Sequence, residues 1–117
     1  MFTRTTSEEA RDSLYGKTWM RFEAWDSGDC AFWLNEDGEV VAYVRFDDSD
    51  NNGMVFFEVR DSGNGIGSQL IAELRAEKPS LYISGDIDTA ACARFWHRNG
   101  FPVDGCELSN GRTWNAE

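Results

Sequence analysis

The sequence predicts a single α/β domain with a mixed, mostly antiparallel central sheet flanked by helices. Residues 18–59 hold several short runs rich in aromatic and β-branched residues, separated by polar turns, which is typical of neighbouring antiparallel strands. After residue 60 the apolar residues recur with the period of a helix instead. A chain of 117 residues is long enough to close one modest hydrophobic core, so we expect residues 1–117 to form one domain.

The first half of the chain is expected to be a helix followed by a meander of strands. The run SEEARDSLY at residues 7–15 has a serine cap, two acids in its first turn and Gly16 as a stop. The run TWMRFEAW at residues 18–25 alternates like a strand, and CAFWL and VVAYVRF flank a turn with an Asp-Gly pair. A polar loop, DDSDNNG, separates the last of these from MVFFEV. Residues 18–59 therefore predict about four antiparallel strands.

After these strands we expect a helix over residues 66–77 and then a short buried strand, SLYISG. Pro79 ends the helix because proline cannot continue the hydrogen-bond ladder. The apolar residues at helical spacing mark one face of this helix. They are Ile66, Leu70, Ile71 and Leu74.

The run DTAACARFWHRNGF predicts a second helix near the C-terminal end. Asp88 or Thr89 is expected to cap its start. Gly100 followed by the apolar Phe101 has the form of a Schellman ending. The Asn-Gly pair at residues 110–111 then predicts a hairpin within GCELSNGRTW.

The chain is acidic, with a net charge of −10, which argues against direct binding to nucleic acid. Residues 1–62 hold fourteen acids and six bases, a net of −8, whereas residues 63–117 hold seven acids and five bases, a net of −2. This asymmetry favours a cationic partner or substrate, and a merely solvated acidic surface explains it equally well.

The three cysteines form no close pairing motif, and a single histidine offers little for a metal site. We therefore expect neither a disulfide framework nor a bound metal. The sequence shows no apolar run of membrane-spanning length and no leader pattern at its start. The expected location is the cytoplasm.

Gly63, Gly65 and Gly67 lie at alternate positions between a strand and a helix. A helix start offers unpaired N–H groups and the positive end of a dipole, and glycines let a phosphate approach these groups closely. The motif therefore predicts a phosphate or pyrophosphate cradle. A tight turn that needs a positive φ is the structural alternative, and one glycine normally suffices for that.

Two common phosphate-binding folds fit the sequence poorly. A P-loop requires lysine before its serine or threonine, and the run Ile66-Gly67-Ser68 has none. A dinucleotide-binding fold would use an acid after the next strand, where Asp86 stands. That fold opens with its glycine-rich unit, however, and here four expected antiparallel strands come first.

Two stretches resemble motifs of the GNAT superfamily of N-acyltransferases. The run EVRDSGNGIGSQLIAEL resembles the acyl-CoA-binding motif of that family, and ARFWHRNGF resembles its second motif, a helix that ends in Gly-Phe. The order of the elements is similar too, over roughly residues 30–102. The chain looks like the small members of the family that occur among phage proteins. The resemblance implies a GNAT-like sheet in which strand 54–60 splays from strand 81–84.

The resemblance further implies a site for acetyl-coenzyme A. The amides of the glycine turn would hold the pyrophosphate, and the pantetheine arm would lie in the gap between the splayed strands. Trp96 stands where the family usually has a tyrosine that protonates the departing thiolate. The cofactor-binding residues implied are Val59, Gly63, Asn64, Gly65, Ile66, Gly67, Ser68, Thr89, Phe95 and Trp96.

Catalysis requires a base for the acceptor amine, because a lysine-like ammonium has a pKa of about 10.4. The resemblance points to Glu58, in the strand MVFFEV, and an exposed Glu58 without a role is the equal alternative. Asp86 is a second candidate, as a base or as a ligand for the cation, whereas Asp88 is expected to cap the helix. Tyr82 is a candidate to replace the missing tyrosine, although core packing is the favoured role for it.

The expected function is transfer of an acetyl group from acetyl-CoA to a primary amine by direct attack in a ternary complex. The acceptor would be a protein lysine or N-terminus, or a small polyamine-like amine. Little chain remains to build an acceptor pocket, which favours a protein acceptor or a homodimer that completes the site. The alternative is a GNAT-shaped acidic protein with weak or no catalysis that binds a basic protein partner.

Overall fold

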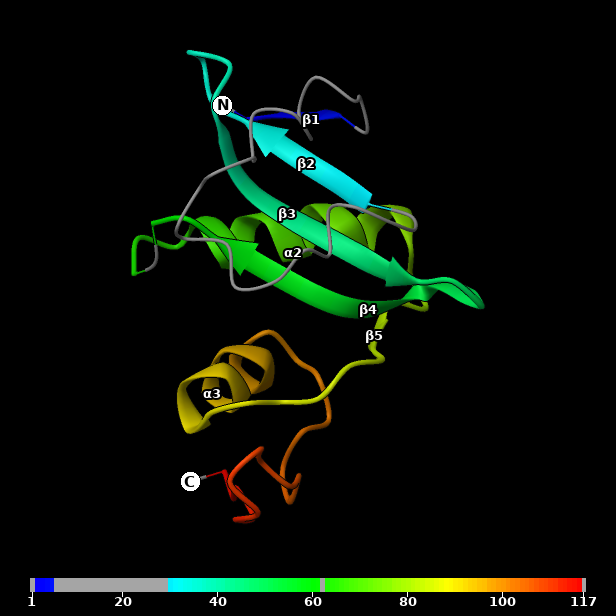
Figure 1. Cartoon of the computed structure of the whole chain (residues 1–117), viewed down its shortest axis with the longest axis vertical. Helices are drawn as coiled ribbons and strands as arrows, with labels where there is room; N and C mark the ends of the chain where they lie inside the picture. Colours follow the sequence, from blue (N-terminus) through cyan, green and yellow to red (C-terminus); the bar gives the residue numbers. More distant parts are fainter. Residues whose placement is uncertain (1, 6–29, 62, 117) are drawn as a thin grey trace.

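The computed structural model describes residues 2–5, 30–61 and 63–116, which form one five-stranded sheet and two helices (Figure 1). The strands lie in the order β1-β2-β3-β4-β5; the first three junctions are antiparallel and the β4–β5 junction is parallel. The predicted class, α/β with a mixed and mostly antiparallel sheet, is confirmed. The elements are β1 (Thr3–Thr5), β2 (Cys30–Leu34), β3 (Val40–Asp47), β4 (Asp50–Val59), α2 (Ile66–Glu77), β5 (Tyr82–Ile83) and α3 (Ala90–Arg98).

Three of the expected strands are present in the structure. The runs CAFWL, VVAYVRF and MVFFEV form β2, β3 and the end of β4 as predicted. The expected helix at residues 7–15 and strand at residues 18–25 lie outside the described residues. The expected loop DDSDNNG is wrong in length, because the ladder between β3 and β4 extends to the pair Asp47 and Asp50. The amide and hydroxyl of Ser49 both donate to the Asp47 carboxylate, which closes this tight turn.

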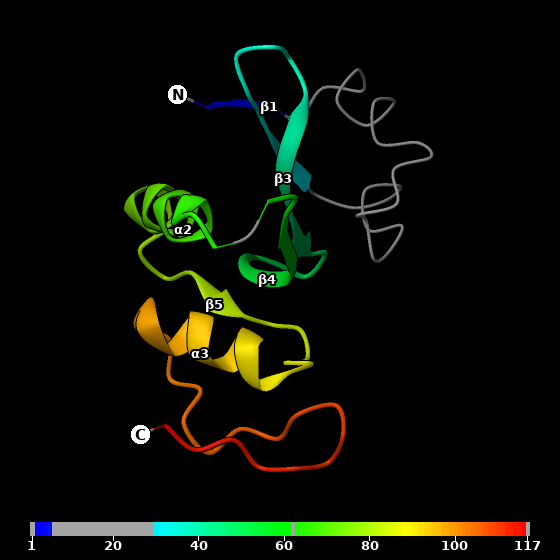
Figure 2. The same cartoon turned by 90° about the vertical axis from the view of Figure 1, so that its left-hand side faces the viewer.

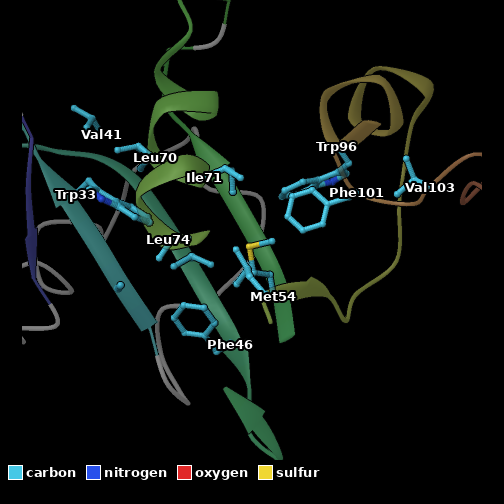
Figure 3. Close-up of a cluster of buried hydrophobic side chains, with 14 residues drawn as sticks. Trp33, Val41, Phe46, Met54, Leu70, Ile71, Leu74, Trp96, Phe101 and Val103 are labelled. Carbon is cyan, nitrogen blue, oxygen red and sulfur yellow. The ribbon is translucent and has the colours of Figure 1, made fainter. Parts of the chain in front are cut away.

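Apolar side chains alternate along the strands and are buried on both faces of the sheet. On one face, Trp33 and Met54 pack with the apolar stripe of α2 (Figure 3). That stripe was predicted correctly: Leu70, Ile71 and Leu74 are buried, and Ile66 packs against the same cluster. On the other face, a separate cluster contains Cys30, Phe32, Val40 and Tyr43.

Figure 2 shows α2 to one side of the sheet and α3 below it, beside β5. Helix α2 has the predicted bounds and stops two residues before Pro79. No helix among the described residues has both the length and the apolar character that crossing a membrane requires.

Helix α3 begins and ends with the local interactions that its sequence encodes. The Thr89 hydroxyl accepts a hydrogen bond from the Cys92 amide, so Thr89 is the cap. The expectation that Asp88 caps the helix is wrong, since its carboxylate accepts from the Ser109 hydroxyl instead. The Phe101 amide donates to the Trp96 carbonyl, and the rings of these two residues lie 5.3 Å apart. Together with the positive φ of the intervening glycine, this is the predicted Schellman ending.

Strand β5 is short and lies at the edge of the sheet. The prediction of a buried strand is wrong for this edge element: Leu81, just before it, is buried, but Tyr82 is 40% exposed. The β4–β5 ladder contains only the pairs Gly53 with Tyr82 and Met54 with Ile83. Strand β4 runs on to Val59, five residues beyond the last pair of this ladder, so the two strands diverge half-way along β4.

The C-terminal segment forms the predicted turn at Asn110 and Gly111. The Leu108 amide donates to the Arg112 carbonyl, and the Trp114 amide donates to the Cys106 carbonyl. Only isolated bridges form here, at Glu107 with Thr113 and at Leu108 with Ile87, so the arms of the hairpin are not continuous strands. The hairpin lies at the end of the molecule opposite β1 in both views (Figures 1 and 2).

Candidate functional site

A cleft of about 250 Å³ opens where β4 and β5 diverge. Its walls are the second half of β4, the segment that follows β5, and the first turns of α3. It is lined by Met54, Val55, Phe56, Phe57, Glu58, Ile83, Gly85, Asp86, Ile87, Asp88, Cys92 and Trp96. Residues from β4 and from the continuous segment 83–96, which follows later in the chain, therefore converge on one site.

The β4 side of the cleft presents main-chain groups. The Arg60 amide donates to the Val41 carbonyl, which fixes the phase of the antiparallel β3–β4 ladder. Because hydrogen-bonded and non-hydrogen-bonded pairs alternate, the amides and carbonyls of Phe57 and Val59 point away from β3. Neither residue is paired with β5. This edge can therefore pair with an extended ligand as a further strand would.

Gly85 determines how closely the chain after β5 approaches β4. A Cβ atom at this position would lie 2.3 Å from the Val55 carbonyl oxygen, which is part of the main chain. The Ser84 and Gly85 amides both donate to the Met54 carbonyl at this point, at 2.9 Å and 3.2 Å. The closed end of the cleft is thus a backbone-to-backbone contact that only glycine permits.

The three glycines between β4 and α2 have different structural roles. Gly63 and Gly65 have positive φ angles, +89° and +81°, and a Cβ at either position would meet no atom of the described residues within 4 Å. Gly67 is helical, and a Cβ there would lie 3.0 Å from the Phe95 ring. The turn therefore needs two left-handed residues rather than one, and the third glycine is required by packing. No described residue occupies the space over Gly63 and Gly65.

The first turn of α2 borders this open space. The Ile66 amide donates to the Asn64 side chain at 3.2 Å, and the Gln69 amide makes the first helical bond to the Gly65 carbonyl. Within residues 30–61 and 63–116, no acceptor lies within hydrogen-bonding distance of the amides of Gly67 and Ser68. Two N–H groups at the positive end of a helix dipole thus remain available to an anion.

Three carboxylates line the cleft: Glu58, Asp86 and Asp88. Glu58 is half-buried and accepts a hydrogen bond of 3.0 Å from the hydroxyl of Tyr43. Asp88 is held by Ser109 at 2.7 Å, and Asp86 is exposed. The lining residues include neither lysine nor arginine, so the cleft carries negative charge along the described part of its wall.

Tyr82 lies apart from this group. It is paired with Gly53, near the start of β4, whereas Glu58 lies near the end of the same strand. Its hydroxyl donates to the Asp50 carboxylate at 3.0 Å, and this hydrogen bond raises the pKa of Tyr82 above its ordinary value of 10.0. The structure thus brings Glu58 and Asp86 together in the cleft but does not bring Tyr82 to them.

The aromatic residues of α3 pack between the cleft and the glycine turn. Phe95 stacks on Phe57 of β4, with ring centroids 6.1 Å apart and an angle of 14° between planes. Trp96 is 9% exposed, lines the cleft and contacts Phe57 as well. Thr89 lines a second cleft, of about 780 Å³, beside the C-terminal hairpin, and it does not line the cleft at β4.

The sequence interpretation missed Tyr43. This residue lies on β3, directly across from Glu58 in the β3–β4 register, and is fully buried. The two residues are fifteen positions apart, so only the register reveals that they are neighbours. A signal was present in the alternation of VVAYVRF, where a polar-tipped tyrosine stands among aliphatic residues and requires a partner when buried.

No protein-family model, curated protein or solved structure matches this chain. The cleft itself is the feature that bears on function. It combines an unpaired strand edge, an open glycine turn at a helix start and a carboxylate held by a buried phenol.

Proposed function

We propose that this chain is a GNAT-type N-acetyltransferase that transfers an acetyl group from acetyl-CoA to a primary amine of a cationic acceptor. The observation that carries the proposal is the early end of the β4–β5 ladder beside the open glycine turn. The ladder stops at Met54 with Ile83, so the rest of the β4 edge faces a cleft. A long ligand with an anionic end and an amide-containing arm suits both features.

The residues present fit such a ligand. The pyrophosphate would lie over Gly63 and Gly65, where none of the residues that the structure describes occupies the space, and would accept hydrogen bonds from the amides of Gly67 and Ser68. The amide groups of the pantetheine arm would pair with the main chain at Phe57 and Val59. The thioester would then lie near the carboxylates of the cleft. Bound there, acetyl-CoA supplies an activated acyl carbon.

Glu58 is the residue best placed to receive the proton of the acceptor amine. It lines the cleft beside the unpaired β4 edge, and a carboxylate near neutral pH is an acceptor only. Glu58 would take a proton from the acceptor ammonium, directly or through water, and so expose the lone pair of the amine. The nitrogen then forms a bond to the acyl carbon as the carbon–sulfur bond breaks, and its second proton passes to water. A free thiol has a pKa of about 8.5, so the departing thiolate can take a proton from water and Trp96 need not act as an acid.

The charge of the cleft supports a cationic acceptor. Asp86 and Asp88 lie across the cleft from β4, and no basic side chain offsets them among the lining residues. Carboxylates that focus a negative potential in a cleft raise the local concentration of cations. The proposed acceptors are therefore a lysine or N-terminus of a protein, or a small polyamine-like amine, with a homodimer as one way to complete the acceptor site.

Two variants at Gly65 that match in size but differ in charge test the proposal. Gly65→Asp places a carboxylate in the open space over the turn, whereas Gly65→Asn places a neutral side chain of the same size there. Asparagine and aspartate both tolerate positive φ better than most residues, so the two variants share the conformational cost. Calorimetry with acetyl-CoA should show a Kd at least about tenfold higher for Gly65→Asp than for Gly65→Asn. Repulsion of about 1.4 kcal/mol between the carboxylate and the pyrophosphate would produce this factor.

The possible outcomes separate the proposal from its rival. Equal affinities of the two variants would contradict a pyrophosphate over the glycine turn. A wild-type protein that does not bind acetyl-CoA at millimolar concentration would overturn the enzyme proposal and leave the acidic interaction protein. Release of free CoA in the presence of spermidine or poly-L-lysine would support transfer to a cationic amine.

A further inference from the structure

We infer that Tyr43 is a positioning residue that holds the Glu58 carboxylate in the orientation from which it accepts the amine proton. This inference rests on the proposed function, because it assigns Tyr43 a role through Glu58. Tyr43 itself is not among the residues that line the cleft. It would therefore touch neither the acceptor nor the acyl group.

The geometry of the pair carries the inference. Tyr43 and Glu58 face each other across the β3–β4 ladder, and the phenol oxygen lies 3.0 Å from Oε1 of Glu58. Tyr43 is 0% exposed and packs with Phe32 and Val40, which leaves its ring no freedom to leave this position. Glu58 is only half-buried, and a hydrogen bond from a neighbour that is itself fixed restricts the rotamers open to its side chain.

The chemistry of a phenol suits this role. A tyrosine hydroxyl ordinarily stays protonated at neutral pH, so it donates to Glu58 and holds one carboxylate oxygen. Reactions that need aligned groups lose rate when a group moves by about 1 Å, so orientation of Glu58 has a direct effect on turnover.

Phe32 indicates that the hydroxyl is not needed for packing. It is paired with Tyr43 across the β2–β3 ladder, belongs to the same buried cluster and is also 0% exposed. A phenylalanine ring thus suits this environment, and a tyrosine at position 43 adds a buried hydroxyl that must be paired. That hydroxyl is paired with the one acidic residue of β4 that lines the cleft.

A double-mutant cycle on turnover tests the inference. Release of CoA from acetyl-CoA is measured with spermidine and with poly-L-lysine for wild type, Tyr43→Phe, Glu58→Gln and the double variant. We expect Tyr43→Phe to lower kcat about tenfold to a hundredfold, as misplacement of a reacting group does. The KM for acetyl-CoA should not change. In the Glu58→Gln background, Tyr43→Phe should have no further effect on kcat, because the carboxylate that Tyr43 positions has already been removed.

Tyr82→Phe is a matched control. It also removes a tyrosine hydroxyl that donates to a carboxylate at 3.0 Å, but at the far end of β4 and outside the cleft. Its kcat should stay within about twofold of wild type, because a group that touches nothing in the cleft has no transition-state interaction to lose. A similar fall in kcat for Tyr82→Phe would mean that the loss at Tyr43 reflects general loosening, and would overturn the inference.

The remaining outcomes are also distinct. Effects of Tyr43→Phe and Glu58→Gln that simply add would make Tyr43 a structural residue, with the proposed function intact. Wild-type protein that releases no CoA with either amine would overturn the proposed function, and the inference with it. Should Tyr43→Phe not fold, Glu58→Asp replaces it: this variant withdraws the carboxylate from the phenol, and a kcat equal to wild type would overturn the inference.

Discussion

Phe95 lies so close to Gly67 that a Cβ atom on the glycine would come within 3.0 Å of the ring. Gly67 belongs to the first turn of α2 and Phe95 to the middle of α3, so this contact sets how closely the two helices approach. Phe95 cannot easily move away, because Phe57 stacks on it and Trp96 packs against its edge. The glycine therefore serves the packing of α3 beside the cleft.

Gly67→Ala should consequently destabilise the protein. Overpacking costs about 1–3 kcal/mol, and the better helix propensity of alanine returns about 1 kcal/mol, so we expect a net loss of about 1 kcal/mol. Urea unfolding measures the free energy. In a Phe95→Leu background the ring is absent, and Gly67→Ala should become neutral or stabilising. The same loss in both backgrounds would contradict the packing role.

The glycine turn shows what the spacing of residues can and cannot predict. The sequence correctly marked a strand, a special turn and a helix beginning at Ile66. It assigned all three glycines to one purpose, whereas Gly63 and Gly65 adopt left-handed backbone and Gly67 makes room for Phe95. The first role depends on the backbone φ angle, and the second depends on a side chain from a helix later in the chain. A short stretch of sequence specifies neither of them.

Gly85→Ala tests whether the end of the cleft depends on a contact between main chains. The added methyl would lie 2.3 Å from the Val55 carbonyl oxygen, and neither backbone can yield without breaking the bonds to Met54. We expect a loss of about 2–3 kcal/mol in the free energy of unfolding, at the upper end of overpacking effects. The amides of Ser84 and Gly85 should also exchange hydrogen faster than in wild type.

Gly53→Ala provides the comparison for Gly85→Ala. A Cβ at Gly53 would meet the side chains of Tyr82 and Ser84 rather than a backbone carbonyl. Side chains at a sheet edge can turn aside, so this variant should lose less stability than Gly85→Ala. A larger loss for Gly53→Ala would show that the cleft is not closed by the contact at Gly85.

The lowered pKa of Asp47 should make the free energy of unfolding depend on pH. The Ser84 hydroxyl, which donates to its carboxylate at 2.7 Å, and the Ser49 amide lower the pKa of Asp47 from 3.8 to about 2. Because the folded pKa is the lower one, the stabilisation is fully present above the unfolded value and is lost as pH falls toward the folded value. Wild type should therefore exceed Asp47→Asn in stability above about pH 4, and the difference should shrink between pH 4 and pH 2.

The Ser84 hydroxyl is the main cause of this effect, so removing it is the control. In a Ser84→Ala background, the stability lost through Asp47→Asn should depend less on pH than it does in the wild-type background. Urea unfolding at a series of pH values measures the loss in both backgrounds. A loss that stays constant from about pH 2 to pH 7 in the wild-type background would contradict the assignment of the lowered pKa to these hydrogen bonds.

The parts of the fold that the sequence did not predict are those that depend on distant partners. Strand β1 is three residues long, Thr3–Thr5, too short for any alternation to be recognised. Tyr82 resembles a core residue by type, yet it is exposed because β5 lies at the sheet edge. The pairing of Tyr43 with Glu58 depends on strand register, which no single strand encodes.

Glu73 links the unpredicted strand to the core, and its removal should be costly. The indole of Trp33, which is 0% exposed, donates to Oε2 of Glu73 at 2.7 Å, and Arg4 of β1 lies 3.5 Å from the same oxygen. Glu73→Ala leaves the indole N–H without its acceptor, at a cost of about 1–3 kcal/mol in the free energy of unfolding. Glu73→Gln keeps an amide oxygen in reach of Trp33 and loses only the charge facing a partly exposed arginine, which contributes about 0–1 kcal/mol. Urea unfolding should therefore rank wild type above Glu73→Gln and Glu73→Ala last, whereas equal stability of the two variants would show that the indole hydrogen bond does not stabilise the fold.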